Sequence, residues 1–293
     1  MILSFHPCYE ADANILCAGR QPDDTDLAAI RRADAVVLPQ GCRWSLYHMA
    51  RTHCPHVFPN YDARFDFPGK TGQAKLFASV GAPHPRTWIF TDTDQFQKES
   101  AQLTTHGYPL VFKLDWGGQG ETVFLLKTPS DLSAALSTAA AYERTGQRGF
   151  VVQAYVKHAS RTLRVAVIGQ TLTAYWRVQE RPTDFGCSLA SGARIDTDAS
   201  PRLRRQATAL VRRFCQRTRI NLAGFDIIFD ESNDTANTPQ ALFLEINFFF
   251  GRTGLGGSAR YYTLLQAEIE QWLTGMGLMQ HRTRKPSSPT EKP

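Results

Sequence analysis

GFDIIFD (Gly224–Asp230) and ALFLEIN (Ala241–Asn247) are two short β-forming segments, each with an acidic residue inside an apolar run. The residues between them are mostly turn formers, so we expect the segments to pair as an antiparallel hairpin. Side chains two apart on a strand share a face, which places Glu245 beside Asn247, and strand pairing adds Asp226. Three oxygen-bearing side chains on one face predict a Mg²⁺ site, since Mg²⁺ takes one or two carboxylates and completes its shell with water and phosphate oxygens. A salt-bridged sheet edge is the alternative that an acidic pair alone would favour.

The composition is that of a soluble protein with about two domains. The chain has 293 residues, of which 42% are hydrophobic and 20% are charged. No apolar run approaches the roughly 20 residues of a membrane span. The first residues, MILSFHP, lack the basic start and the apolar length of a signal peptide. We therefore expect a cytoplasmic protein with no membrane partner.

The chain has six cysteines and a net charge of +6, which bear on the state of its thiols and on the kind of partner it binds. The cysteines follow no metal-type or redox-type spacing, so we expect reduced thiols and no structural zinc. The positive charge suits an anionic partner such as nucleic acid, a nucleotide or an acidic substrate. However, most arginines between positions 202 and 219 fall in one predicted helix, where arginines usually form a solvated face. No zinc-finger spacing or aromatic RNA-binding signature accompanies them, so nucleic acid is not the expected partner.

The N-terminal part of the chain, residues 1–68, predicts a small parallel α/β domain. We expect strands at 2–6, 34–38 and 56–58, and helices at 27–31 and 45–52. Residues Asp23–Asp26 offer the N-cap of the first helix. The pair Pro68-Gly69 marks the expected boundary of this domain.

Residues 69–275 predict a larger domain that mixes helices and strands, α/β (α+β), and residues 276–293 predict a disordered tail. We expect helices at 70–80, 93–105, 130–141 with Ser130 as the N-cap, 201–218 and 258–273. Besides the hairpin described above, we expect strands at 109–113, 121–126, 150–156, 162–168 and 171–178. Residues 181–198 and 248–257 are expected to be irregular.

A glycine-rich turn follows the predicted strand that ends at Lys113. The turn contains Gly117, Gly118, Gln119 and Gly120. Glycines let the backbone approach an anion and offer free N–H groups, while a lysine ammonium supplies a point charge for phosphate oxygens. By itself such a sequence is more often just a turn. It is not a P-loop, because no Lys-Ser or Lys-Thr pair follows the glycines.

The order of these features resembles the ATP-grasp enzymes. A helix opened by a lysine leads to the lysine strand with its glycine-rich turn, a Gln-x-Tyr-Val strand, an arginine strand, and finally Asp…Glu-x-Asn. The sequence is most similar to the branch that contains the ribosomal-protein glutamate ligases, alongside glutathione synthetases and D-alanine:D-alanine ligase. The resemblance implies an ATP-grasp fold for residues 69–275, and residues 1–68 fit the small α/β domain that precedes such folds.

The resemblance also implies roles for the candidate residues. Lys70 and Lys113 correspond to phosphate-binding lysines, and the turn from Gly117 to Gly120 corresponds to a flap that closes over the phosphates. The adenine would lie against the backbone of an inter-lobe strand formed by Gln153, Ala154, Tyr155 and Val156. The Mg²⁺ ligands would be Asp226, Glu245 and Asn247. Basic residues near the transferring phosphate would be Arg164 and Arg177.

Structural alternatives exist for several of these residues: a surface charge for Lys70 and Arg177, an ordinary strand residue for Gln153, and an ion-pair partner for Arg164.

The sequence departs from the glutamate ligases around the acceptor site. Thr162 stands where those enzymes carry an acidic residue that helps to hold the ribose, and Gly186–Ser188 and Ser191 replace polar and basic groups that contact phosphate or acceptor. After Glu-x-Asn the chain continues FFFGRTGLGG instead of turning toward Pro-Gly. Arg252 in this segment is a further catalytic candidate, as a replacement for lost positive charge or else as a loop-surface residue.

The resemblance implies an ATP-dependent ligase that joins a carboxylate to an amine through an acylphosphate and releases ADP and phosphate. The expected cofactors are ATP and Mg²⁺, with Mn²⁺ as the other metal considered, and the expected substrates are small molecules or peptides. Two other functions stay open: an ATP-grasp phosphotransferase, and a nucleotide-binding regulatory or nucleic-acid-binding protein without ligase turnover. A homodimer is the default expectation for the oligomeric state.

Overall fold

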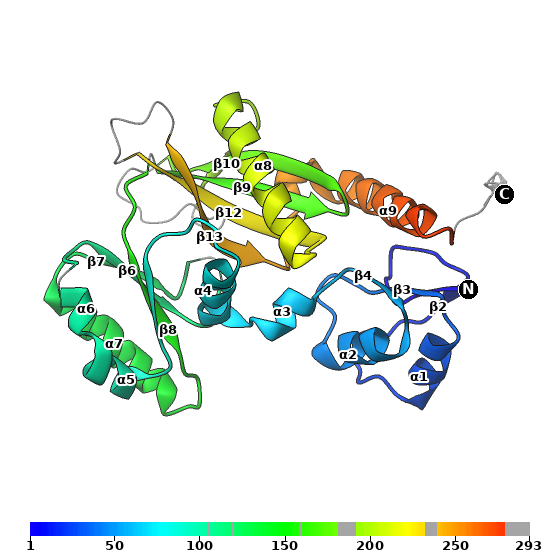
Figure 1. Cartoon of the computed structure of the whole chain (residues 1–293), viewed down its shortest axis with the longest axis horizontal. Coiled ribbons are helices and arrows are strands. Elements are labelled where there is room, and N and C mark those ends of the chain that lie inside the picture. Colours follow the sequence, from blue (N-terminus) through cyan, green and yellow to red (C-terminus); the bar gives the residue numbers. More distant parts are fainter. Residues whose placement is uncertain (105, 119, 159, 181–191, 232–238, 279–293) are drawn as a thin grey trace, which may run out of the picture. The chain divides into compact units, whose positions relative to one another are not determined.

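The computed structural model describes residues 1–278 except 105, 119, 159, 181–191 and 232–238. Packing divides the chain into two compact units (Figure 1), which are treated separately. The first unit contains Met1–Phe58 and the chain from Ala259 onward, and the second contains Pro59–Ser258. The division into 1–68 and 69–275 made from the sequence stays a prediction, and residues 279–293 of the predicted tail lie outside the described part.

The first unit is built on a parallel sheet. The strands are β1 (Ile2–Ser4), β2 (Ala13–Asn14), β3 (Ala35–Val37) and β4 (His56–Phe58), in the order β2-β1-β3-β4. The helices are α1 (Asp24–Arg31), α2 (Trp44–His53) and most of α9 (Gly257–Gly275). Asp23 caps α1 in a capping box with Asp26, as predicted. Strand β2 was missed because two half-exposed residues carry no apolar pattern.

Helix α9 joins this unit although the whole second unit, Pro59–Ser258, separates it from Phe58 in the sequence. The Tyr261 hydroxyl lies 3.2 Å from Gln40 Oε1. The Trp272 ring packs on Phe58, with the ring centroids 5.5 Å apart. No helix in the described part of the chain is both long and apolar enough to cross a membrane.

The second unit begins with α3 (Asp62–Asp66) and α4 (Gly69–Ser79), followed by an antiparallel sheet in the order β5-β8-β6-β7. Its strands are β5 (Thr87–Phe90), β6 (Leu110–Leu114), β7 (Val123–Leu126) and β8 (Phe150–Ala154). The associated helices are α5 (Thr93–Glu99), α6 (Ala101–Thr104) and α7 (Pro129–Glu143). Helices α5 and α7 contact each other and the sheet (Figure 1), and they close an apolar core around Phe112 and Phe150.

Two expectations for these helices are wrong. The single helix at 93–105 is two short helices, because α5 ends at Ser100, a residue type whose side chain competes with helical backbone bonding. Helix α7 is not capped by Ser130: the Thr128 hydroxyl accepts from the Asp131 amide in a capping box, so the helix begins earlier, at Pro129.

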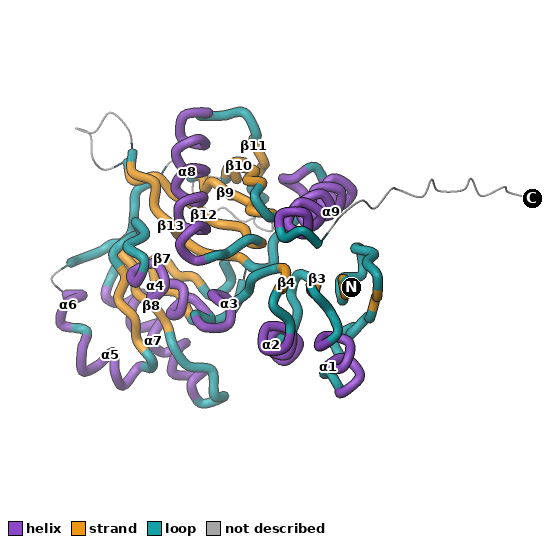
Figure 2. The backbone as a smooth tube through the Cα atoms, turned by 45° about the vertical axis from the view of Figure 1, so that its right-hand side comes forward, coloured by secondary structure: helices purple, strands orange, loops and turns teal. Residues whose placement is uncertain are grey.

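The second sheet of this unit has the order β11-β10-β9-β12-β13 and is antiparallel throughout. Its strands are β9 (Arg161–Ile168), β10 (Thr171–Val178), β11 (Arg194–Asp196), β12 (Leu222–Asp230) and β13 (Gln240–Asn247). Strand β11 lies in a segment predicted to be irregular. Helix α8 (Pro201–Thr218) lies against this sheet, and a short 3₁₀ helix, η1 (Thr253–Leu255), follows β13 (Figures 1 and 2).

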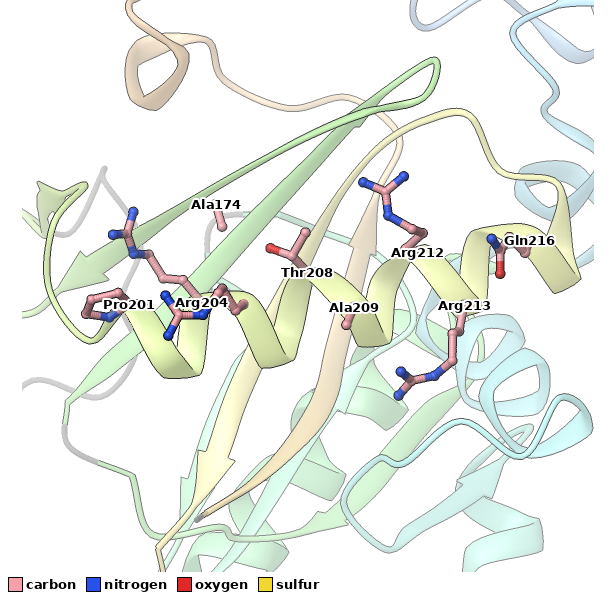
Figure 3. Close-up of a pocket in the computed structure, with 9 residues that line it drawn as sticks. Ala174, Pro201, Arg204, Thr208, Ala209, Arg212, Arg213 and Gln216 are labelled. Atoms are coloured by element: carbon pink, nitrogen blue, oxygen red, sulfur yellow. The ribbon is translucent and has the colours of Figure 1, made fainter.

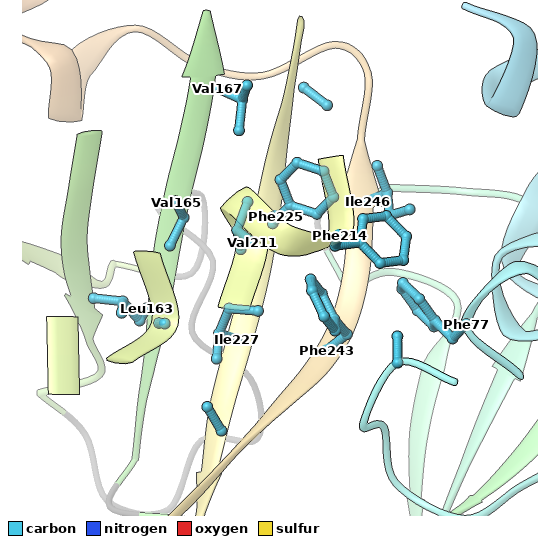
Figure 4. Packing of buried hydrophobic residues seen from close by; sticks show 14 of the residues in the cluster. Phe77, Leu163, Val165, Val167, Val211, Phe214, Phe225, Ile227, Phe243 and Ile246 are labelled. Atoms are coloured by element: carbon cyan, nitrogen blue, oxygen red, sulfur yellow. The ribbon is translucent and has the colours of Figure 1, made fainter. Parts of the chain in front are cut away.

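Aromatic packing fixes α4 and α8 on the hairpin of β12 and β13 (Figure 4). The Phe243 ring centroid lies 5.3 Å from that of Phe77 on α4 and 4.8 Å from that of Phe214 on α8. Phe225 packs edge-on against Phe214, at 5.7 Å. Buried aromatic pairs of this kind add about 0.5–1.5 kcal/mol beyond their area, so the hairpin is held from both neighbouring helices.

Candidate functional site

The hairpin of β12 and β13 forms as predicted and brings the acidic residues together. Asp226 is paired with Glu245 across the strands, and Gly224 is paired with Asn247. The register shifts directly after Asp226, which marks a β-bulge. Bulges commonly redirect side chains beside active sites. On its other side, Asp226 faces Arg164 of β9.

Asp226 is held by two arginines and one amide. Arg164 donates from Nε to Oδ1 at 2.6 Å and from Nη2 to Oδ2 at 3.1 Å. Arg177 Nη2 lies 2.6 Å from Oδ1, and Asn247 Nδ2 donates to Oδ2 at 3.2 Å. Burial opposes ionisation, but Arg164 and Arg177 outweigh it and lower the pKa of Asp226 to about 2. The carboxylate is therefore ionised, with both oxygens engaged.

Glu245 has the opposite environment. Burial and the nearby Asp226 charge raise the pKa of Glu245, although Lys70 and Lys113 partly offset them. Among the described residues no group donates a hydrogen bond to its carboxylate. A half-buried carboxylate without a direct partner is stabilised by a cation, and the Asn247 amide oxygen is left available because its Nδ2 faces Asp226.

The donor set fits a hard cation. The described residues contain no group of three or more His, Cys, Asp or Glu side chains that could hold a metal ion, and this cluster has only two carboxylates, so an amide oxygen would have to complete the protein's share of the ligands. Two carboxylates and an amide oxygen match what Mg²⁺ takes from protein, since it keeps several waters and phosphate oxygens. Glu245 and Asn247 are the better placed ligands, while the oxygens of Asp226 face arginines.

Lys113 points into the same cluster from β6. Its ammonium donates to Gln153 Oε1 at 2.7 Å, and Gln153 in turn donates from Nε2 to Thr87 Oγ1 at 2.9 Å. Burial lowers the pKa of Lys113 to about 8, with Glu245 acting in the opposite direction and Lys70 in the same one. A buried ammonium held by a single amide has unused donors, which suits an incoming anion.

Lys70 lies in the first turn of α4 and reaches the glycine-rich turn. Its Nζ donates to the carbonyl oxygens of Trp116, at 2.9 Å, and Gly117, at 3.2 Å. Burial lowers the pKa of Lys70, opposed by Glu245 and Asp115. The Asp115 carboxylate accepts from the Thr71 amide at 2.7 Å, as an anion at a helix N-terminus does.

The glycine-rich turn joins β6 and β7. Gly117 has φ +81°, and a Cβ there would lie 2.5 Å from Thr122, so only glycine fits. Gly118 and Gly120 have open space around them, which leaves their backbone approachable. Gln119 lies outside the described residues.

The Gln-Ala-Tyr-Val segment runs from the end of β8 toward β9. The Ala154 amide donates to the Arg86 carbonyl at 2.8 Å. This bond extends the pairing of β8 with β5 by one residue beyond the pair of Gln153 and Thr87. Tyr155 and Val156 follow the strand and are half-buried. This segment connects the two sheets, and its contact with a bound adenine stays a prediction.

Arg252 lies on the loop after β13 rather than on a strand of the sheet. Its Nη1 is 3.5 Å from Ser258 Oγ, and the residue caps η1. Arg164 and Arg177 converge on one carboxylate. The catalytic roles of Arg164, Arg177 and Arg252 all stay predictions.

Two residues that position the site were not identified from the sequence. Gln73 on α4 forms two 2.8 Å hydrogen bonds with the backbone of Ile246. Gln73 Nε2 donates to the Ile246 carbonyl, and the Ile246 amide donates to Gln73 Oε1. These bonds fix the backbone between Glu245 and Asn247. At Gly224, a Cβ would come within 2.9 Å of Arg164 Nη1. A glycine inside a strand signals close approach, so Gly224 was identifiable, whereas no local signal marked Gln73.

Comparison with known proteins gives the family. Residues 69–263 match the model of the RimK-like ATP-grasp domain family, which is most of the chain. The chain belongs to the RimK-like ATP-grasp family. Membership makes it an ATP-dependent ligase that forms C–N bonds, and the predicted fold class is confirmed. No curated protein sequence matches the chain significantly.

Solved ATP-grasp structures share the fold at low sequence identity. A RimK domain ATP-grasp protein from Sphaerobacter thermophilus is 14% identical, with a TM-score of 0.61, and the match covers 91% of this chain and 98% of that one. D-alanyl-alanine synthetase A from Vibrio cholerae is 15% identical, with a TM-score of 0.60, covering 83% and 77%. A D-alanine–D-alanine ligase from Bacillus anthracis complexed with ATP is 13% identical, with a TM-score of 0.60, covering 90% and 85%.

Proposed function

We propose that this ATP-grasp protein ligates a carboxylate to an amine through an acylphosphate, with ADP and phosphate as products. The observation that supports this most directly is the pairing of Asp226 with Glu245 across β12 and β13 beside the buried Lys113. Lys70, Lys113 and Arg164 all act to lower the pKa of Glu245, against its burial. Three cations around one carboxylate without a direct partner form a site for a triphosphate and its divalent ion.

Each step has a physical reason. A carboxylate is a poor electrophile because its leaving group would be oxide, so a γ-phosphoryl group is first transferred to a carboxylate oxygen and ADP departs. The amine then attacks the acyl carbon, and phosphate leaves with the C–O bonding pair. Phosphoryl transfer needs positioning and charge neutralisation rather than a protein nucleophile.

The chain's own residues would divide this work. Lys70 and Lys113 would bind phosphate oxygens, and the turn from Gly117 to Gly120, Gln119 included, would close over them. Arg164 and Arg177, oriented by Asp226, would face the transferring phosphoryl group. Mg²⁺ or Mn²⁺, held chiefly by Glu245 and Asn247, would supply charge neutralisation between phosphate oxygens.

The substrates are proposed to be small molecules or peptides, one bearing the carboxylate and the other the amine. The ATP-grasp structures above include a D-alanyl-alanine synthetase and a D-alanine–D-alanine ligase. The proposed setting is the cytoplasm, and a homodimer is the default assembly.

A turnover screen tests the proposal. Phosphate and ADP release from Mg-ATP would be measured with pooled carboxylates and amines, including amino acids and short peptides, using Glu245→Ala as the control. Ligation predicts ADP release that needs both a carboxylate and an amine and that disappears in the variant. ADP release that ignores the amine would instead indicate a phosphotransferase, and equal rates in Glu245→Ala would contradict the site.

A further inference from the structure

Helix α8 carries an arginine face that the ligase site does not use. The helix has six arginines between Pro201 and Thr218 and no acidic residue. Its opposite face, with Ala207, Val211 and Phe214, is buried in the sheet core. Five of the six arginines are exposed, and Arg204 is half-buried.

Four of these arginines line an open groove in the second unit. The groove has a volume of about 610 Å³ and runs along α8 beside Ala174 of β10. Two pairs of consecutive arginines line it, Arg204 with Arg205 before Thr208 and Arg212 with Arg213 after it. Figure 3 shows Arg212 and Arg213 extending to opposite sides of the helix. The pairs are eight residues apart on the helix, which is about 12 Å.

The charge of the groove is only partly compensated within the described part of the chain, where Arg204 is among the groups that lower the pKa of Asp196. No described carboxylate forms an ion pair with Arg205, Arg212 or Arg213. Arg204 donates from Nη2 to the Asp198 carbonyl at 3.3 Å, but its buried Nε has no partner. Arg204 and Arg205 also lie near the positive end of the helix dipole, where cations are unfavourable. A bound anion would relieve each of these costs.

We propose that this groove binds an acidic peptide segment with carboxylates at both arginine pairs. An extended chain advances about 3.3 Å per residue, so carboxylates roughly four residues apart match the 12 Å separation of the pairs. The guanidinium fork binds carboxylates bidentately. Small side chains at Thr208 and Ala174 leave room for a peptide backbone between the pairs.

The lining favours a peptide over a nucleic acid. Single-stranded nucleic acid is held by aromatic side chains that stack on bases, and no residue lining the groove is aromatic. The cations are all arginines, the side chain that matches planar carboxylates.

Fluorescence anisotropy with the full chain tests this inference. The probe is a labelled deca-glutamate peptide, with deca-glutamine and a ten-nucleotide single-stranded DNA as comparison ligands. Arg205→Glu/Arg212→Glu removes the groove charge, and Arg31→Glu/Arg32→Glu makes the same change in net charge in the first unit. We expect deca-glutamate to bind, more weakly at higher salt, and roughly tenfold more weakly to the groove variant than to the control variant.

Three outcomes would overturn the proposal: no binding of deca-glutamate, equal loss of binding in both variants, or tighter binding of the DNA than of the peptide. Circular dichroism of each variant establishes that it is folded. If the groove variant does not fold, Arg205→Gln/Arg212→Gln replaces it, paired with Arg31→Gln/Arg32→Gln. Because the groove residues are outside the ligase site, ADP release is a separate readout that the groove variant should leave unchanged.

Discussion

Asp226 and Glu245, which are paired across one hairpin, have different roles. Asp226 is ionised and bound by Arg164 and Arg177, so it organises cations within the protein. Glu245 has a raised pKa and no direct partner among the described residues, so it is available to an external cation. The distinction comes from neighbouring strands rather than from the local sequence, in which both residues read as a carboxylate in an apolar run.

Substitution separates these roles in the free protein. Asp226→Asn should lower the free energy of unfolding by about 3 kcal/mol, because it leaves two buried guanidinium groups without their charge partner. Glu245→Gln should change it by less than about 0.5 kcal/mol, since it removes a desolvated charge. Urea unfolding in EDTA measures both. Equal destabilisation, or a stable Asp226→Asn protein, would show that Asp226 does not organise the arginines.

The lowered pKa of Lys113 predicts how the stability of the protein and its affinity for nucleotide change with pH. Its pKa of about 8 lies below the ordinary 10.5, so the folded protein releases this proton first. Between these values the unfolded chain binds more protons, and the stability of the free protein should rise with pH. Nucleotide affinity should do the reverse, because the neutral amine no longer attracts phosphate, and from pH 7 to 9 it should fall about tenfold.

Calorimetric titration with Mg·AMP-PNP across this pH range measures the effect. Lys113→Arg is the matched control, because its charge does not titrate, and its affinity should vary less with pH. The same slope in both proteins would assign the titration to another group, such as Lys70, whose pKa is also lowered.

At the scale of elements, the hairpin of β6 and β7 depends on one glycine more than on its neighbours. Gly117→Ala forces a left-handed φ on a residue with a Cβ and pushes that atom into Thr122, at a cost of about 1–2 kcal/mol. Gly118→Ala has open space and serves as the control. Hydrogen exchange of the free protein should speed up in the turn for the first variant only; equal exchange in both would contradict the geometry.

The elements that were predicted correctly have local signals. The run ALFLEIN and the turn formers before it predicted β13 and its pairing with β12, and Asp23 predicted the start of α1. What was missed depends on distant contacts. The ion pairs of Asp226 with Arg164 and Arg177 depend on the register of β9 and β10. The bulge after Asp226 forms only when β12 pairs with β13. Gln73 bonds to Ile246, which is 173 residues away in the sequence.

At the scale of the whole molecule, the chain returns at its end to the unit where it began. Helix α9 groups with the unit that contains Met1–Phe58, whereas the division into 1–68 and 69–275 follows the order of the sequence and stays a prediction. Apolar patterning identifies a helix but does not specify which sheet it packs on. By contrast, the ordered series of site residues lies entirely within the second unit, which is why reading those residues in chain order led to the correct family.

In the proposed function, Glu245 would hold a divalent ion that neutralises charge on the bound triphosphate. The most direct test is the dissociation constant of AMP-PNP with and without Mg²⁺, for the wild-type protein and for Glu245→Gln. We predict that Mg²⁺ tightens binding to the wild-type protein and has little effect on binding to the variant, which still binds the nucleotide through Lys70 and Lys113. Absence of nucleotide binding, or an equal effect of Mg²⁺ on both proteins, would contradict the account.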